Sequence, residues 1–272
     1  MDNALLDHIF VTVDTETYER ARDSAFLREN YARVKVKEAR SNLSGKYGSV
    51  CVAGTNTLFE LFDAAVPPLP GISGGVVLSY EQEAALDDVY QRLLDAGVTE
   101  VEQRRVERTV EGDLTLPWYR LVRPNLGENS PVTLMFVAVS PVYYEHIGAL
   151  PEADGRRTRR GYLDAVLGAE NSAGKALADI GAVTLRVRAE RAKRIIGTLE
   201  TIGFQPSREN GEQVLAGTDV AIRIVVDDGA PEGVVAMGAE LRQPWKGDPL
   251  TLGAGCALGP DGWSFSPYRW EN

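Results

Sequence analysis

The sequence predicts an α+β protein built from tandem βαβββ modules that form cupped mixed sheets with flanking helices. Three observations predict this fold class. The N-terminal segments follow the order strand, helix, strand, strand, strand; the same order restarts after a stretch rich in proline and glycine; and it starts a third time near residue 182. A chain of 272 residues, 44% hydrophobic and 25% charged, has the size and composition of a globular protein of one or two domains.

The first module begins with an alternating segment. Residues 5–13 place Ile9 and Val11 on one face of a predicted strand and His8 on the other. Asp14 or Thr15 can cap the helix that follows, because the side chain of either can accept a hydrogen bond from the first helical turn. Three short segments rich in β-forming residues complete the module, at 32–39, 48–53 and 58–63.

The second module repeats this order. Prolines and glycines in 67–75 end the first module, and the apolar residues 76–80 predict a new strand. Helical spacing of apolar residues follows over 81–96, with Gly97 as the natural end of that helix. Three further strands are predicted at 100–110, 118–123 and 132–139.

After residue 140 the order of strand, helix and strands breaks off, and it resumes near residue 182. A helix is predicted over 160–167, a strand over 183–187 and a helix over 191–202, and strands are predicted at 213–216, 220–226 and 234–241. The tail after residue 245 suits a degenerate fourth unit. We therefore divide the chain into paired modules over 1–150, a linker with a short helix over 151–180, and a third module with a degenerate C-terminal unit over 181–272.

Charge and cysteine content restrict the function. A net charge of −10 repels polyphosphate backbones and argues against nucleic-acid binding. No apolar run approaches the roughly 20 residues that cross a membrane, and the N-terminus lacks the features of a signal peptide. Cys51 and Cys256 lie far apart and form no metal-binding spacing, so we expect a reduced, cytoplasmic protein. Because two modules can pair within one chain, both a monomer and a homodimer are compatible with the sequence.

The opening Leu6-Asp7-His8-Ile9-Phe10-Val11-Thr12-Val13 resembles the first strand of vicinal-oxygen-chelate proteins. This superfamily includes glyoxalase I, ring-cleaving dioxygenases, fosfomycin- and bleomycin-resistance proteins and epimerases. The resemblance implies a metal ligand on the first strand of a module and a glutamate ligand on the fourth. His8 matches the first position, and Glu60, within Leu58-Phe59-Glu60-Leu61-Phe62, matches the second.

Physical chemistry supports a role for this pair. An unpaired carboxylate inside an apolar strand is costly to desolvate, and a divalent cation or a strong donor at Glu60 would remove that cost. The imidazole of His8 is a common transition-metal ligand. The other interpretations are a His–Glu hydrogen bond without metal and edge residues that meet solvent. The homologous positions of the second and third modules carry no ligands, so four ligands cannot be assembled from them.

Further candidates complete the predicted site. His146 is the second of the two histidines and could join His8 and Glu60 as a triad of two histidines and one carboxylate; alternatively it is an exposed loop residue. Glu60 and Glu145 are the candidate catalytic groups. Four side chains are candidates for substrate binding, two as carboxylate-binding cations and two as stacking rings: Arg186, Arg223, Tyr119 and Tyr143. The alternatives for them are a solvated sheet face and the core.

A cluster of basic residues follows the second module. It reads either as a solvated surface cluster or as an anion-binding or interface patch, and it consists of Arg156, Arg157, Arg159 and Arg160.

Three functions remain open. The first is a divalent-metal enzyme (iron, manganese, zinc or nickel) with lyase, isomerase or dioxygenase chemistry on an oxygen-chelating small molecule. The second is a metal-free ligand-binding protein, such as a drug-sequestering resistance factor, for which the negative net charge suits a cationic drug. The third is a scaffold that binds a protein partner. No serine-hydrolase, phosphate-loop or dinucleotide-binding motif occurs.

Overall fold

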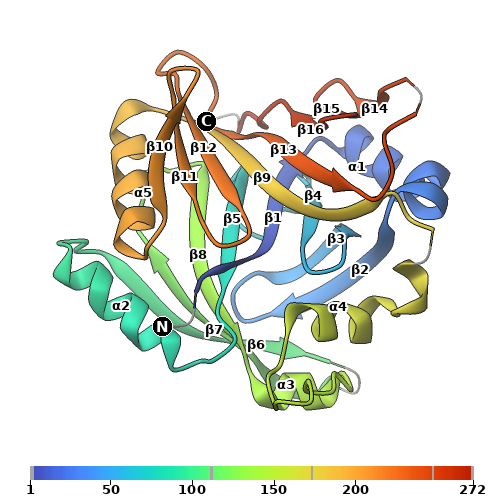
Figure 1. The fold of residues 1–272 in the computed structure, drawn as a ribbon, viewed down its shortest axis with the longest axis horizontal. Coiled ribbons are helices and arrows are strands. Elements are labelled where there is room, and N and C mark those ends of the chain that lie inside the picture. Colours follow the sequence, from blue (N-terminus) through green and yellow to red (C-terminus); the bar gives the residue numbers. More distant parts are fainter. Residues whose placement is uncertain (1–2, 111–112, 173, 247, 271–272) are drawn as a thin grey trace.

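The computed structural model describes residues 3–110, 113–172, 174–246 and 248–270, and it confirms the predicted fold class. The described strands form a closed eight-stranded barrel and an open eight-stranded sheet that lies over one side of it (Figure 1). Among the described residues, no helix combines the length and hydrophobicity needed to cross a membrane.

The barrel is built from the first two modules. The first contains β1 (Leu5–Val13), α1 (Thr15–Asp23), the π-helical turn η1 (Leu27–Tyr31), β2 (Arg33–Ser41), β3 (Gly45–Ala53) and β4 (Leu58–Asp63). The second contains β5 (Gly74–Ser79), α2 (Ala85–Asp95), β6 (Val101–Thr109), β7 (Thr115–Pro124) and β8 (Val132–Val139). In each module the first strand pairs parallel to the last, which the intervening helix permits. The barrel closes where β1 pairs with β5 and β2 pairs with β6.

Helix ends follow the predicted chemistry. Asp14 caps α1, because its carboxylate accepts hydrogen bonds from the Thr17 main-chain N–H at 2.9 Å and from the Thr17 hydroxyl at 2.8 Å. Gly97 follows α2 with φ +82°, a left-handed conformation that favours glycine.

The open sheet contains the third module and the degenerate unit. The third module comprises β9 (Leu177–Val187), α5 (Ala189–Thr201), β10 (Gln205–Glu209), β11 (Glu212–Ala216) and β12 (Ala221–Val226). The last unit comprises β13 (Gly233–Leu241), β14 (Leu250–Gly253), β15 (Cys256–Gly259) and β16 (Gly262–Phe265). This sheet repeats the strand order of the barrel without closing. In the described part of the chain no helix follows β13, and β13 and β16 run antiparallel, whereas β5 and β8 run parallel.

The connection between barrel and sheet holds α3 (Pro141–His146), α4 (Arg159–Leu167) and the turn η3 (Glu170–Ser172). The helix predicted over 160–167 is α4. Among the elements that were not predicted are β10 and α3. Strand β10 is exposed along its whole length and shows no apolar alternation, and α3 is too short to carry a periodic pattern.

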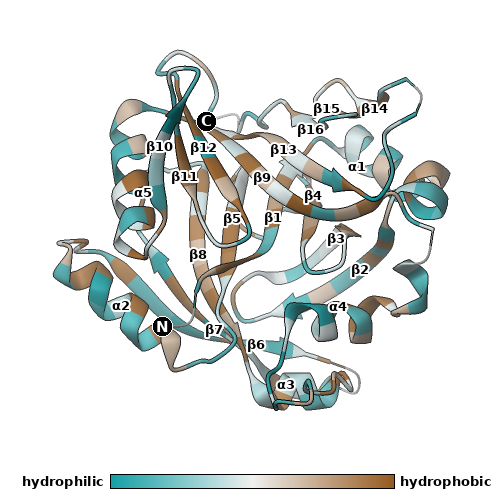
Figure 2. Cartoon of the chain, viewed as in Figure 1, coloured by the Kyte–Doolittle hydropathy of each residue, from teal (hydrophilic) through white to brown (hydrophobic). Residues whose placement is uncertain are grey.

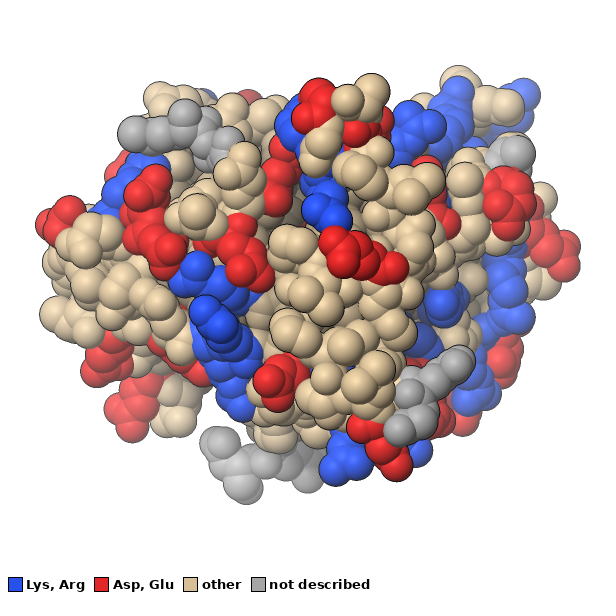
Figure 3. Space-filling view, turned by 90° about the horizontal axis from the view of Figure 1, so that it is seen from below, with Lys and Arg blue, Asp and Glu red and all other residues tan. Residues whose placement is uncertain are grey.

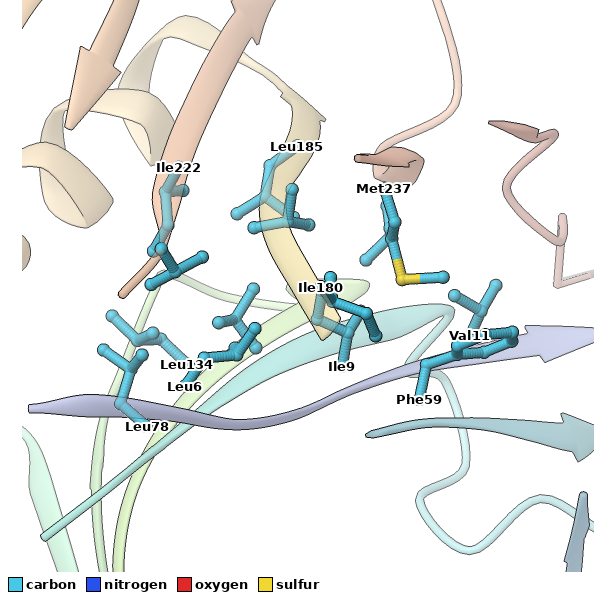
Figure 4. Packing of buried hydrophobic residues seen from close by; sticks show 14 of the residues in the cluster. Leu6, Ile9, Val11, Phe59, Leu78, Leu134, Ile180, Leu185, Ile222 and Met237 are labelled. Carbon is cyan, nitrogen blue, oxygen red and sulfur yellow. The ribbon is translucent and has the colours of Figure 1, made fainter. Parts of the chain in front are cut away.

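The main core lies between the barrel and the open sheet. Side chains of β1 that point out of the barrel, including Ile9 and Val11, pack against side chains of β9 and β13 that point toward the barrel, including Leu185 and Met237 (Figure 4). Hydrophobic stretches accordingly concentrate on β5, β8, β9 and β13 (Figure 2). A second, smaller cluster fills the barrel interior and includes Phe10, Phe62, Val77 and Met135. The alternation predicted for β1 is therefore confirmed.

Asp179 of β9 ties the open sheet to the barrel. Its carboxylate accepts hydrogen bonds from the main-chain N–H of Asn56 at 3.0 Å, from the N–H of Thr57 at 2.8 Å and from the Thr57 hydroxyl at 2.6 Å. These contacts fix the turn that leads into β4, the strand that carries Glu60.

Candidate functional site

A β-bulge in β1 brings two neighbouring polar residues to the same side of the barrel wall. The pairing of β1 with β5 shifts register between Leu6 and His8. Leu6 and Ile9 both belong to the core outside the barrel, and the two residues between them, Asp7 and His8, both line the pocket inside it. Because side chains of a regular strand alternate, only the extra residue of a bulge allows this arrangement.

The pocket inside the barrel has a volume of about 100 Å³. Its walls are partly apolar, with Phe10, Phe62, Val77, Met135 and Val137 among them. Its charged and titratable side chains, apart from the tyrosines, are Asp7, His8, Lys37, Glu60 and Arg159.

Asp7 holds the ring of His8. Its Oδ1 lies 2.7 Å from His8 Nδ1, and its Oδ2 lies 3.0 Å from Nη1 of Arg159. Burial alone would raise the pKa of Asp7, but the Arg159 guanidinium and the hydrogen bond to His8 outweigh burial and hold that pKa below its usual value. An ionised Asp7 can only accept, so this contact places a proton of His8 on Nδ1; in the neutral ring, Nε2 then carries the lone pair.

Glu60 forms a buried ion pair with Lys37. The Lys37 ammonium contacts Glu60 Oε1, and the Cys51 thiol donates to the same oxygen at 3.2 Å. The side chains of Lys37 and Glu60 are only 15% and 8% exposed. Burial would raise the pKa of Glu60, but Lys37 and His8 outweigh it and lower that pKa. Burial acts to lower the pKa of Lys37, while Cys51 and Glu60 raise it well above its usual value. Both groups are therefore charged near neutral pH.

Three strands position this pair. Glu60 on β4 lies beside Phe10 on β1 and opposite Cys51 on β3, and Lys37 on β2 reaches it from across β3. Burial raises the pKa of the Cys51 thiol to about 12, so Cys51 acts as a neutral donor and not as a thiolate nucleophile.

The structure brings His8 and Glu60 to one pocket, as predicted, but it leaves the other proposed ligand outside. His146 is exposed at the end of α3, with its ring 6.0 Å from that of Tyr143, and it does not line the pocket. Glu145 is also exposed and pairs with Arg157 at 2.9 Å. Because α3 follows β8 directly, it carries both residues on the surface.

The donor set does not fit a divalent metal ion. Within the described part of the chain, no group of three or more His, Cys, Asp or Glu side chains is placed to hold one. The oxygen of Glu60 that the fold would offer to a metal already binds the Lys37 ammonium and the Cys51 thiol. The predicted triad of His8, Glu60 and His146 is therefore not assembled in this structure.

The four candidates for substrate binding do not all lie at the pocket. Tyr119 lines the pocket, whereas Tyr143 is buried beside it, with its ring 5.9 Å from that of Trp118. Arg186 and Arg223 belong to the open sheet. Arg186 donates to the Pro231 carbonyl at 2.9 Å. Arg223 forms ion pairs with Glu209 at 2.8 Å and with Glu212 at 3.3 Å.

The arginine cluster lies close to carboxylates. Each of its four members pairs with a carboxylate: Arg156 with Asp154, Arg157 with Glu145, Arg159 with Asp7, and Arg160 with Asp164. Figure 3 shows acidic and basic side chains interspersed over one face of the molecule. Arg159 differs from the other three because its side chain, 9% exposed, enters the pocket.

Sequence reasoning missed three residues of this site. Asp7 was visible only as a neighbour of His8, and the bulge that turns it inward has no signature in the sequence. Lys37 stands in a strand where lysines and valines alternate, which does not reveal which face lies inside. Arg159 was placed only within its surface cluster.

Comparisons with known proteins support the fold. A family model described as a family of unknown function, DUF5829, matches residues 6–261. A search of curated proteins found no match. Among solved structures, a hypothetical protein from Staphylococcus aureus is similar over 95% of this chain and 96% of its own, with a TM-score of 0.60 and 15% identity, which shows a shared fold.

Two further structures are more distant. A catechol 2,3-dioxygenase is matched over 100% of this chain and 91% of its own, with a TM-score of 0.48 and 12% identity. A Mn(II)-bound glyoxalase from Novosphingobium aromaticivorans is matched over 88% of this chain and 65% of its own, with a TM-score of 0.45 and 10% identity. Likeness of this degree carries no argument about the chemistry of this chain.

Proposed function

The chain belongs to the DUF5829 family, whose function is unknown, and we propose from the barrel pocket that the protein is a small-molecule enzyme in which His8 transfers a proton. One observation carries this proposal: Asp7 and His8, placed side by side by a bulge, form a 2.7 Å pair at a pocket inside the barrel. We further propose that the chain is a divergent member of the vicinal-oxygen-chelate superfamily, because His8 and Glu60 stand on the strands where the resemblance places ligands.

The geometry of His8 suits a general base. A carboxylate that accepts Nδ1–H fixes the ring and stabilises the imidazolium that forms when Nε2 takes a proton. Arg159 in turn holds that carboxylate ionised, with its Nη1 3.0 Å from Asp7 Oδ2. The side chain of His8 remains 25% exposed, so a ligand in the pocket can reach it. Proton transfer of this kind is common to lyase and isomerase reactions.

The size of the pocket limits the substrate. A cavity of about 100 Å³ is smaller than the roughly 300–1,000 Å³ of drug-sized sites and closer to a cavity that holds benzene. The alternative of a metal-free drug-sequestering protein therefore requires the pocket to widen. The metal-dependent version of the enzyme needs a third ligand beside His8 and Glu60, which the described residues do not supply.

Deuterium exchange tests the proposal without a known substrate. The protein is incubated in D₂O with pyruvate, acetoacetate or oxaloacetate, and loss of the C–H signal is followed by NMR against a protein-free control. We expect catalysed exchange on at least one compound and a fall of roughly 10²–10⁴-fold in His8→Gln, which is the usual contribution of a general base. His146→Gln is the matched control, because His146 is exposed and outside the pocket.

Two outcomes would contradict the proposal. One is equal exchange in His8→Gln and wild type. The other is binding of a probe in the pocket, seen by ligand-observed NMR, with no exchange on any compound; that result would favour a binding protein.

A further inference from the structure

We propose that the Lys37 ammonium, held by Glu60, takes the place of the metal ion at this site, so that the pocket binds a small anionic oxygen compound and excludes divalent cations. This inference rests on the proposed function and names its substrate class. Lys37 reaches Glu60 from across β3, and both side chains line the pocket together with His8.

The charges of the pocket are already balanced. Among the described residues that line it, two carboxylates face two cations: Glu60 contacts Lys37, and Asp7 contacts Arg159. With His8 neutral, these four charges sum to zero. A divalent ion would therefore add two uncompensated positive charges beside a buried ammonium, and burial of unbalanced charge is strongly unfavourable.

The free N–H donors of Lys37 favour a small compound with an anionic oxygen. An ammonium has three N–H donors, and the contact with Glu60 uses one of them. The remaining donors can hold a carboxylate or enolate oxygen, and the proton that His8 takes from the compound leaves an imidazolium that balances the charge of the enolate. Phe10, Phe62 and Val77 provide an apolar surface for the carbon part of such a ligand.

Removal of the lysine charge should raise the affinity of this pocket for a divalent cation. In Lys37→Met, the Glu60 carboxylate loses its cation, while His8 still lines the same pocket. We expect the affinity for Zn²⁺, measured by isothermal titration on dialysed protein, to rise at least about a hundredfold over wild type, because unit charges a few ångströms apart interact by several kcal/mol at protein dielectric. Adding His8→Ala or Glu60→Gln to Lys37→Met should abolish the gain.

Two variants keep the test interpretable. Lys37→Gln removes the charge but can still donate to Glu60, so it serves as the test variant if Lys37→Met folds poorly. We expect it to gain Zn²⁺ affinity as well. Lys46→Met is the matched control, because Lys46 is 73% exposed on β3, pairs with Glu38 and lies outside the pocket. We expect no gain from it. Circular dichroism establishes that each variant is folded.

The inference is overturned if elemental analysis finds one equivalent of metal in wild type that His8→Ala and Glu60→Gln both lose. It is equally overturned if the folded Lys37 variants bind Zn²⁺ no better than wild type. Deuterium exchange separates this result from the proposed function. A metal ion bound in wild type together with His8-dependent exchange would refute only the role of Lys37, whereas gain of Zn²⁺ in Lys37→Met without any exchange would refute only the enzyme.

Discussion

Lys37→Met should destabilise the folded protein because it leaves Glu60 charged and buried. In the wild type the carboxylate is 8% exposed, and it has two donors, the Lys37 ammonium and the Cys51 thiol. The variant keeps only the thiol at 3.2 Å, which is a weak donor.

The expected loss is about 3 kcal/mol in the free energy of unfolding at neutral pH. Breaking one side of a buried ion pair costs about 3–5 kcal/mol, and the remaining thiol contact together with access to the pocket places this case at the lower end. By contrast, Lys46→Met breaks a pair whose side chains are 73% and 75% exposed, and such surface pairs contribute about 0–1 kcal/mol.

Urea denaturation of wild type, Lys37→Met, Glu60→Gln, Lys46→Met and the double variant Lys37→Met/Glu60→Gln measures these values. The double variant should recover at least half of the loss, because it removes the unpaired charge as well. A loss below about 1 kcal/mol in Lys37→Met, or a double variant as unstable as the sum of its single changes, would refute the description of a buried charged pair.

Three further predictions follow from the same structure. Asp7→Asn should lower the rate of deuterium exchange about as much as His8→Gln, because an amide does not hold the Nδ1–H tautomer, and a normal rate would show that Asp7 does not orient the ring. Asp179→Ala should lower the free energy of unfolding by roughly 2–3 kcal/mol in urea titrations, since it leaves the Thr57 N–H and hydroxyl without their acceptor, and an unchanged midpoint would contradict that role. The pKa values of Asp7 and Glu60 are lowered in the folded protein, so both groups stabilise it at pH values above their unfolded pKa values, near 4. This stability is lost as the pH falls through the folded pKa values. A free energy of unfolding that rises on acidification below pH 4 would contradict these shifts.

The fold class could be predicted from the sequence because the same order of strands and helix repeats along the chain. Three successive rounds of strand, helix and strands predicted the modules, and the alternation around Ile9 and Val11 predicted which face of β1 enters the core. Strand β10 was missed because all of its residues are exposed, so no apolar alternation marks it. The antiparallel pairing of β16 with β13 goes with the absence of a helix between β13 and β14 in the described part of the chain, and composition alone did not reveal that absence.

The site was predictable only in part. His8 and Glu60 were found because a histidine and a carboxylate inside apolar strands are conspicuous, and they do share a pocket. Lys37 was not found, because an ion pair between β2 and β4 depends on strand order. His146 was assigned to the site because it is the second histidine, but a short helix after β8 keeps it at the surface.

The tautomer of His8 tests the central claim most directly. With two histidines in the chain, ¹⁵N–¹H NMR of the imidazole groups assigns His8 by comparison with His8→Gln. We expect His8 to carry a proton at Nδ1 and its Nε2 signal to shift when pyruvate or acetoacetate is added, while the signals of His146 stay unchanged. A His8 ring protonated at Nε2, or one that is insensitive to a ligand bound in the barrel, would contradict the claim that Asp7 prepares His8 to accept a proton.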